Sequence, residues 1–270
     1  MPSGEKSNHK SMLKYFIFSI IISTIISNSI VLFSDSHIKH FVSLLVLNIT
    51  AAIASILGII TIYRHGIYGV HGKSYLFLTL GIISWFFADF LVLYNYHSSH
   101  IKELELASTT DFLWFIGYGF LALHLFIIMR SLDIKINSKV FIGISIITSF
   151  FIGYNVVNLL NYDFVDNDFL ATIVTLAYPI LDFILIIPSS IILITLRKDF
   201  LHNFPWFLSS LSLLVNAIAD DGYVNDFVAG NSENLWFWEL FYIADFIIMS
   251  AALLWYNKFN ISKTLARKTK

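Results

Sequence analysis

The sequence predicts an all-α integral membrane protein, a polytopic bundle of about eight transmembrane helices. Of its 270 residues, 57% are hydrophobic and only 13% are charged, about half the charged share of a soluble globular domain. The hydrophobic residues form long runs, and the Lys and Arg residues gather in alternate connections between those runs. A membrane β-barrel requires alternating apolar and polar residues, whereas these runs are apolar all round, so helices are favoured over strands.

Eight apolar runs are each long enough to cross a hydrocarbon core of about 30 Å. The first follows a basic segment but exceeds the hydrophobic region of a signal peptide, so we expect an uncleaved helix. The sixth contains Pro179 and Pro188, which predict a kink or a tilt. The predicted spans are Tyr15–Phe33, Phe41–Tyr63, Tyr75–Tyr94, Phe112–Met129, Val140–Leu160, Phe169–Leu196, Phe204–Tyr223 and Leu235–Tyr256.

The basic residues predict the orientation in the cell membrane. With eight spans, 15 of the 17 Lys and Arg residues fall on one side, and only Lys39 and Lys102 fall on the other. Cytoplasmic connections carry the excess of basic residues, so we expect both termini in the cytoplasm. The predicted parts are a cytoplasmic N-terminal segment (1–14), a first four-helix half (15–131), a second four-helix half (139–257) and a basic cytoplasmic tail (258–270).

The two halves are similar to each other in sequence. The segment from Asn48 to Arg64 parallels that from Asp182 to Arg197. Ala88-Asp89 parallels Ala219-Asp220, and Asp111 at the start of the fourth span parallels Glu239 in the eighth. Because each half enters and leaves on the same side, we expect two parallel repeats.

Acidic residues within the spans are the main functional signal. An ionisable side chain at the bilayer centre costs at least about 2.5–3.5 kcal/mol on insertion scales, so such residues mark functional sites. No Lys or Arg lies inside any span. The acids must therefore be protonated, hydrated in a cavity, hydrogen-bonded to neutral groups or bound to a cation.

Several of these acids have simpler explanations. Asp111 follows two threonines where a helix starts, which is typical of an N-cap. For Asp89, Asp182, Asp220 and Asp245 capping is not available. They either share a polar cavity or form interhelical hydrogen bonds as neutral groups. Glu239 stays open between a solvated group and a site residue. We expect solvated loop or cap positions for Asp163, Asp166, Asp168 and Glu233.

Helical spacing places aromatic and polar residues on the faces of these acids. Asn216 and Tyr223 share a face with Asp220, Tyr178 shares one with Asp182, and Tyr242 shares one with Glu239. Trp85 lies one turn from Asp89, whereas Asp245 lies about 240° around the helix from Glu239, so those two acids cannot both point straight into one cavity. The candidate ligand- or cation-binding residues are Asp89, Asp182, Asp220, Asp221, Asp245, Asp111, Glu239, Tyr178, Asn216, Tyr118 and Trp114. Acidic and aromatic groups together favour a cationic ligand that arrives from the outer side.

Recognisable catalytic patterns are missing from the sequence, so we expect no enzyme, no catalytic residue and no cofactor. There is no Walker A sequence, no GxSxG and no HExxH. His97 and His100 flank one span, but no ligand spacing supports a metal, which stays unassigned. His124 is expected to be a hydrogen-bonded packing residue, and no nucleic-acid partner is expected.

Four short segments recur in a fixed order along the later spans, namely Ala88-Asp89, Asp111 to Tyr118, Ala177 to Asp182 and Ala219-Asp220. In this order they resemble the multispanning membrane input modules that stand ahead of GGDEF/EAL and histidine-kinase signalling domains. The resemblance implies a membrane sensor without catalytic residues. About 14 residues follow the last span, so the expectation is that a signal passes to a separate cytoplasmic partner. The alternatives are a small cation- or proton-coupled transporter and, less favoured, an intramembrane enzyme.

Overall fold

The computed structural model describes residues 3–98, 108–132, 138–161, 169–197, 200 and 203–261, and this part of the chain is all helical. Each predicted span falls on one helix, and most of the helices extend beyond the predicted ends. The helices are α1 (Ser3–Leu32), α2 (Lys39–His65), α3 (Gly69–Ser98), α4 (Thr109–Ser131), α5 (Ser138–Asn161), α6 (Phe169–Leu196), α7 (Phe204–Val228) and α8 (Leu235–Trp255). The short turns η3 (Ser232–Asn234) and η4 (Tyr256–Asn260) flank α8.

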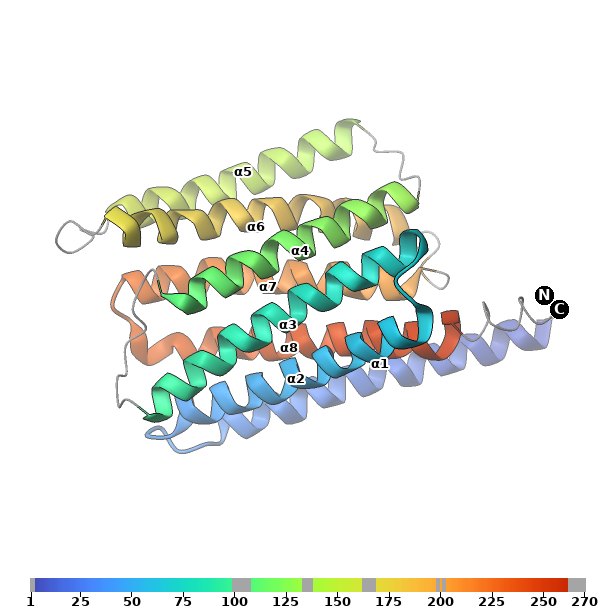
Figure 1. The fold of residues 1–270 in the computed structure, drawn as a ribbon, viewed down its shortest axis with the longest axis horizontal. Coiled ribbons are helices and arrows are strands. Elements are labelled where there is room, and N and C mark those ends of the chain that lie inside the picture. The colour runs from blue at the N-terminus through green and yellow to red at the C-terminus, as the bar shows by residue number, and fades with distance from the viewer. Residues whose placement is uncertain are drawn as a thin grey trace.

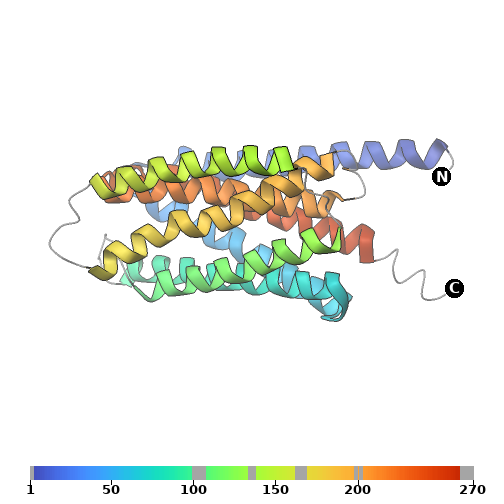
Figure 2. The same ribbon diagram turned by 90° about the horizontal axis from the view of Figure 1, so that it is seen from above.

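Successive helices run in opposite directions along one bundle axis (Figure 1). The start of α1 and the end of α8 consequently lie at the same end, which we call the terminal end (Figure 1). The view from above shows the same side-by-side arrangement (Figure 2). An even number of passes is the arrangement that the distribution of basic residues predicts.

Seven of the helices, α1 to α6 and α8, are long and apolar enough to cross a membrane. The eighth, α7, is more polar because it carries serines, Asn216 and the adjacent acids Asp220 and Asp221. It lies between α6 and α8, so neighbouring helices cover much of it. The protein is thus an integral membrane bundle in which α7, with its adjacent acids, is one of the inner helices.

Six helices form a closed ring in the order α2, α3, α4, α6, α7, α8 and back to α2. Helix α1 packs outside this ring on α2 and α8, and α5 packs outside it on α6 and α7. The neighbours α2–α3, α3–α4 and α4–α6 correspond to α6–α7, α7–α8 and α8–α2 when the second half is matched to the first. This pattern is the one that the predicted parallel duplication requires, while superposition of the halves stays a prediction.

Aromatic rings close the interior of the ring near the terminal end. The ring centroid of Tyr75 on α3 lies 4.0 Å from that of Tyr256 and 4.9 Å from that of Trp206 on α7. Beyond them the interior is filled by buried aliphatic side chains, among them Leu78, Leu213 and Leu253. Buried polar groups such as Ser74 and His124 also lie in this half, whereas the buried acids Asp89, Asp111 and Glu239 lie in the opposite half of the bundle.

Helices α3 and α4 approach each other closely at two glycines. A Cβ on Gly117 would lie 2.3 Å from the Trp85 ring and 3.2 Å from the backbone oxygen of Gly81. On the other side of the contact, a Cβ on Gly81 would lie 2.6 Å from Leu121. The absence of a side chain at Gly117 leaves room for the indole of Trp85, which borders the cavity described next.

Candidate ligand-binding cavity

A cavity of about 110 Å³ lies inside the ring, and we call it the acidic cavity. Helices α2, α3, α4, α6, α7 and α8 all contribute to its lining. It lies near the starts of α4 and α8 and near the ends of α3 and α7, in the half of the bundle away from the terminal end. Its carboxyl groups belong to Asp89, Asp111, Asp220 and Glu239.

The acids of α3 and α7 receive hydrogen bonds from the helix that follows each of them. Trp114 Nε1 on α4 donates to Asp89 Oδ1 at 3.0 Å. The Tyr242 hydroxyl on α8 donates to Asp220 Oδ1. Trp114 and Tyr242 are three residues after Asp111 and Glu239 respectively, so the two donors occupy matching positions in the predicted repeat.

Asp111 on α4 holds the helix start and also faces the cavity, which corrects its expected role as the N-cap. Ser108 is the N-cap, and Asp111 is the third helical residue of a capping box. Its Oδ2 accepts hydrogen bonds from the backbone N–H of Ser108 at 2.8 Å and from the Ser108 hydroxyl at 3.0 Å. Its Oδ1 accepts one from the Tyr178 hydroxyl on α6 at 2.5 Å. Capping and site membership are thus compatible in one carboxyl group.

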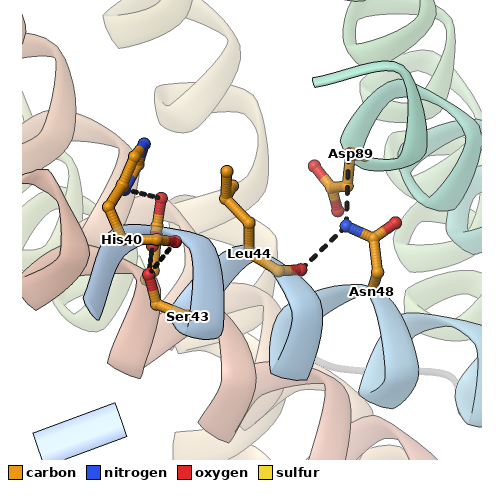
Figure 3. A network of polar contacts seen from close by, with 6 residues as sticks. His40, Ser43, Leu44, Asn48 and Asp89 are labelled. Atoms are coloured by element: carbon orange, nitrogen blue, oxygen red, sulfur yellow. Dashed lines mark hydrogen bonds and ion pairs between the residues drawn. The ribbon is translucent and has the colours of Figure 1, made fainter. Parts of the chain in front are cut away.

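Glu239, at the matching place on α8, is held from α2. The Ser43 hydroxyl donates to Glu239 Oε2, and His40 Nδ1 lies 3.2 Å from Oε1 (Figure 3). Glu239 is buried and lines the cavity, so it is not the solvated group of the first alternative, while a role in ligand binding stays a prediction. Each half therefore holds an acid of the other half. Helix α6 binds Asp111 of the first half, and helix α2 binds Glu239 of the second half.

Helix α2 is also tied directly to α3 beside the cavity. The Asn48 side-chain amide donates to the backbone oxygen of Leu44 at 2.9 Å and to that of Asp89 at 3.2 Å (Figure 3). Asn48 corresponds to Asp182 in the predicted repeat. The first half thus has a neutral amide where the second half has a carboxyl group.

Asp182 on α6 lies behind the cavity wall and is fully buried. The Tyr118 hydroxyl on α4 contacts both Asp182 Oδ1, at 2.7 Å, and Asp220 Oδ2. A phenol has one hydrogen and can donate it to only one of these oxygens. The other contact is a hydrogen bond only if that carboxyl group is protonated and donates to the phenol oxygen. If both contacts are hydrogen bonds, one of the two carboxyl groups therefore carries a proton.

The remaining candidate acids do not line the acidic cavity. Asp245 is buried on the other side of α8, where the Ser212 hydroxyl and the Asn216 side-chain amide donate to its carboxyl group. This separation from Glu239 confirms the prediction from helical spacing. Asp221 lines a different crevice, beside Asn155 and Asn225.

The charge balance around the cavity is strongly one-sided. No Lys or Arg lines it, and across the described part of the chain the recorded ion pair of its acids is the one between Glu239 and His40. Asn216 adds a side-chain oxygen that has no hydrogen-bond partner. The lining thus offers several hydrogen-bond acceptors and no fixed positive charge.

The aromatic lining consists of Trp85, Trp114, Tyr118, Tyr178, Tyr223, Phe227, Tyr242 and Phe246. Helical spacing indicates Trp85, Tyr223 and Tyr242 as neighbours of the acids, although the candidate set omits them. The residues that sequence reasoning missed are His40 and Ser43. The sequence indicates them only through helical spacing. His40 and Ser43 are three residues apart, and Leu44 and Leu47, which line the cavity, each follow one of them by four residues.

The expected packing role of His124 is confirmed. It is fully buried, and its Nδ1 lies 2.9 Å from the Ser74 hydroxyl. His97 packs near the Phe41 ring and Glu233 is exposed, whereas His100, Asp163, Asp166 and Asp168 lie outside the described residues. Within the described ranges, no three His, Asp or Glu side chains gather closely enough to hold a metal ion.

No protein-family model, curated protein or solved structure matches the chain.

Proposed function

We propose that the protein is a non-enzymatic membrane module that binds a small organic cation in the acidic cavity. The observation that carries the proposal is the lining itself, in which four carboxyl groups from four helices surround one space without a Lys or Arg. Buried charges require pairing, and a bound cation would supply the missing positive charge.

Size and aromatic content narrow the class of ligand. A cavity of about 150 Å³ accommodates a molecule such as benzene. A volume of 110 Å³ therefore suits an organic cation of a few heavy atoms. Indole and phenol faces attract quaternary ammonium groups, with about 0.5–2 kcal/mol from each cation–π contact. A choline-like ammonium matches the charge and the aromatic lining, and its trimethylammonium end, rather than the whole molecule, is of the size that the volume admits.

The closed interior beyond the cavity supports ligand binding over transport. Tyr75, Trp206 and Tyr256 pack against one another between the cavity and the terminal end. The resemblance to input modules supports a second part of the proposal, in which ligand binding changes the interaction of the protein with a separate cytoplasmic partner. The basic connections predicted at the terminal end would face that partner.

A titration with choline and its neutral isostere 3,3-dimethylbutan-1-ol tests the proposal in purified protein. Trp85 and Trp114 line the cavity, so intrinsic fluorescence should report binding. We expect choline to bind and the isostere to bind at least about tenfold more weakly, because it lacks the charge that the carboxyl groups attract. Asp220→Asn should weaken choline binding by about tenfold to a hundredfold. The exposed Asp35 gives the matched control, Asp35→Asn, which should leave binding unchanged.

Equal binding of choline and the neutral isostere would overturn the cation proposal. Liposomes containing the protein separate binding from transport. If labelled choline accumulates inside the liposomes and this accumulation is lost in Asp220→Asn, the protein is a transporter and not a receptor.

A further inference from the structure

A second polar space lies at the side of the bundle, between α5 and α7 and beside the start of α8. We call it the lateral crevice, and its volume is about 400 Å³. Its polar lining includes Asn155, Asn158, Asp221, Asn225 and Asp226. It does not share Asp220 or any other acid with the acidic cavity, so it is a separate site.

The crevice contains buried polar atoms that have nothing to bond. Asp221 is only 3% exposed, and neither of its carboxyl oxygens has a hydrogen-bond partner in the described part of the chain. Asn155 is 5% exposed, and its Nδ2 is likewise without a partner there. A buried polar group without a hydrogen bond is costly, so two acceptors and one donor in the same crevice indicate a site where a ligand can bind.

Asp226, Asn225 and Trp238, which also line the crevice, do have hydrogen-bond partners. Trp238 Nε1 donates to Asp226 Oδ2 at 2.6 Å. Asn225 Nδ2 donates to Asn155 Oδ1 at 2.8 Å and to the backbone oxygen of Asp221 at 2.6 Å. These bonds fix the frame of the crevice and leave the Asp221 carboxyl group and the Asn155 amino group for a ligand.

The surroundings decide the class of ligand. Among the described residues no Lys or Arg lines the crevice, which disfavours a ligand with negative charge alone, while the carboxyl group of Asp221 favours a ligand that carries a cationic group. The apolar rim is exposed, with Tyr154 at 62% and Ile218 at 44%. Because α5 packs outside the ring, this rim faces the surroundings of the bundle, which in a membrane are lipids.

We propose that the lateral crevice binds the primary ammonium headgroup of an aminophospholipid. The ammonium donates to the Asp221 oxygens, and Asn155 Nδ2 donates to a phosphate oxygen of the same headgroup. A free primary amine shares the ammonium chemistry, but only a phospholipid also places acyl chains against Tyr154 and Ile218. The proposal does not depend on the ligand of the acidic cavity.

Native mass spectrometry of the full-length protein, with defined lipids added, tests this site. The probes are dioleoylphosphatidylethanolamine, dioleoylphosphatidylglycerol, which has no ammonium, and free ethanolamine. We expect the ethanolamine lipid to be retained about tenfold better than the glycerol lipid, because hydrogen bonds to a charged group are strong. Asp221→Asn should abolish that preference, whereas the neighbouring Asp220→Asn should keep it.

Three other results would contradict or change this assignment of the lateral crevice. Equal retention of the two lipids by the wild-type protein, or an unchanged preference in Asp221→Asn, overturns the proposal. Displacement of the lipid by millimolar ethanolamine would assign the crevice to a free amine instead. Asp221→Leu is the second variant if Asp221→Asn folds poorly, since no hydrogen bond of the Asp221 carboxyl group is lost. Choline titration of the same variants separates the sites, since only Asp220→Asn should weaken choline binding.

Discussion

Tyr118 joins two carboxyl groups of the second half through a hydroxyl supplied by the first. Its hydroxyl contacts Asp182 and Asp220, and the ring is 2% exposed. In the predicted repeat its counterpart on α8 is Phe246, which has no hydroxyl. Among the described residues, Tyr118 thus links α4, α6 and α7, and Phe246 forms no corresponding hydrogen bond from α8.

Tyr118→Phe should destabilise the protein by about 1–3 kcal/mol, because two buried carboxyl groups lose their common partner. Thermal unfolding in detergent measures the loss as a lower melting temperature. Tyr94→Phe is the control, since Tyr94 is 58% exposed on α3. Equal melting temperatures for the two variants would show that the Tyr118 hydroxyl contributes nothing to stability.

Asp220 and Asp221 show how far sequence reasoning reaches at the residue scale. Consecutive residues of a helix point about 100° apart, so adjacent acids on α7 cannot face one space. The structure places Asp220 in the acidic cavity and Asp221 in the lateral crevice. Periodicity identifies which residues share a face, but it does not specify which neighbouring helix that face meets. For that reason the placement of Asp182 behind Tyr118 was not predictable.

At the scale of the element, the helices themselves were predictable from length and apolar content, because a membrane permits few alternatives. Helix ends were harder. At the start of α4, Asp111 was the expected N-cap. The N-cap is Ser108, three residues earlier, and Asp111 completes the capping box. The close approach of α3 and α4 was also not predictable from the sequence, since a glycine in a helix does not specify which residue packs against it.

Gly117→Ala should weaken the packing of α3 on α4, because its Cβ would meet the Trp85 ring at 2.3 Å. Overpacking of this kind costs about 1–3 kcal/mol, which a lower melting temperature measures. Displacement of Trp85 would also lengthen its 3.1 Å hydrogen bond to the backbone oxygen of Trp114. The change should therefore reduce choline binding as well.

Gly119 on the same helix provides the control. A Cβ there meets nothing within 4 Å, so Gly119→Ala should be neutral or slightly stabilising, as alanine favours helix. Equal effects of the two substitutions would refute the importance of the α3–α4 contact.

At the scale of the whole molecule, the ring of six helices and the two outer helices follow the order expected of a duplicated unit. Pairs such as Asp89 with Asp220 and Asp111 with Glu239 predict the duplication, but they do not predict the ring. All four of these acids line one cavity. The closing contacts between the halves, α4 with α6 and α8 with α2, could not be predicted, since no sequence pattern specifies them.

Reporters fused at the N-terminus, at the C-terminus and after Lys198 should all indicate the cytoplasm, and one after Glu105 should indicate the exterior. The physical reason is the location of 15 of the 17 basic residues on one predicted side. Fluorescent and phosphatase fusions measure the side of each position. An exterior C-terminus paired with a cytoplasmic N-terminus would contradict the eight-pass bundle.

If one carboxyl group of the Asp182–Asp220 pair carries the proton that the two Tyr118 contacts require, ligand binding has an electrical consequence. Moving one elementary charge through the full transmembrane voltage changes its energy by about 2.3 kcal/mol per 100 mV. A monovalent cation that enters beside Asp220 and displaces this proton to the same side carries no net charge across the field. Its affinity would then be nearly independent of the membrane potential and would fall as the medium on that side becomes more acidic.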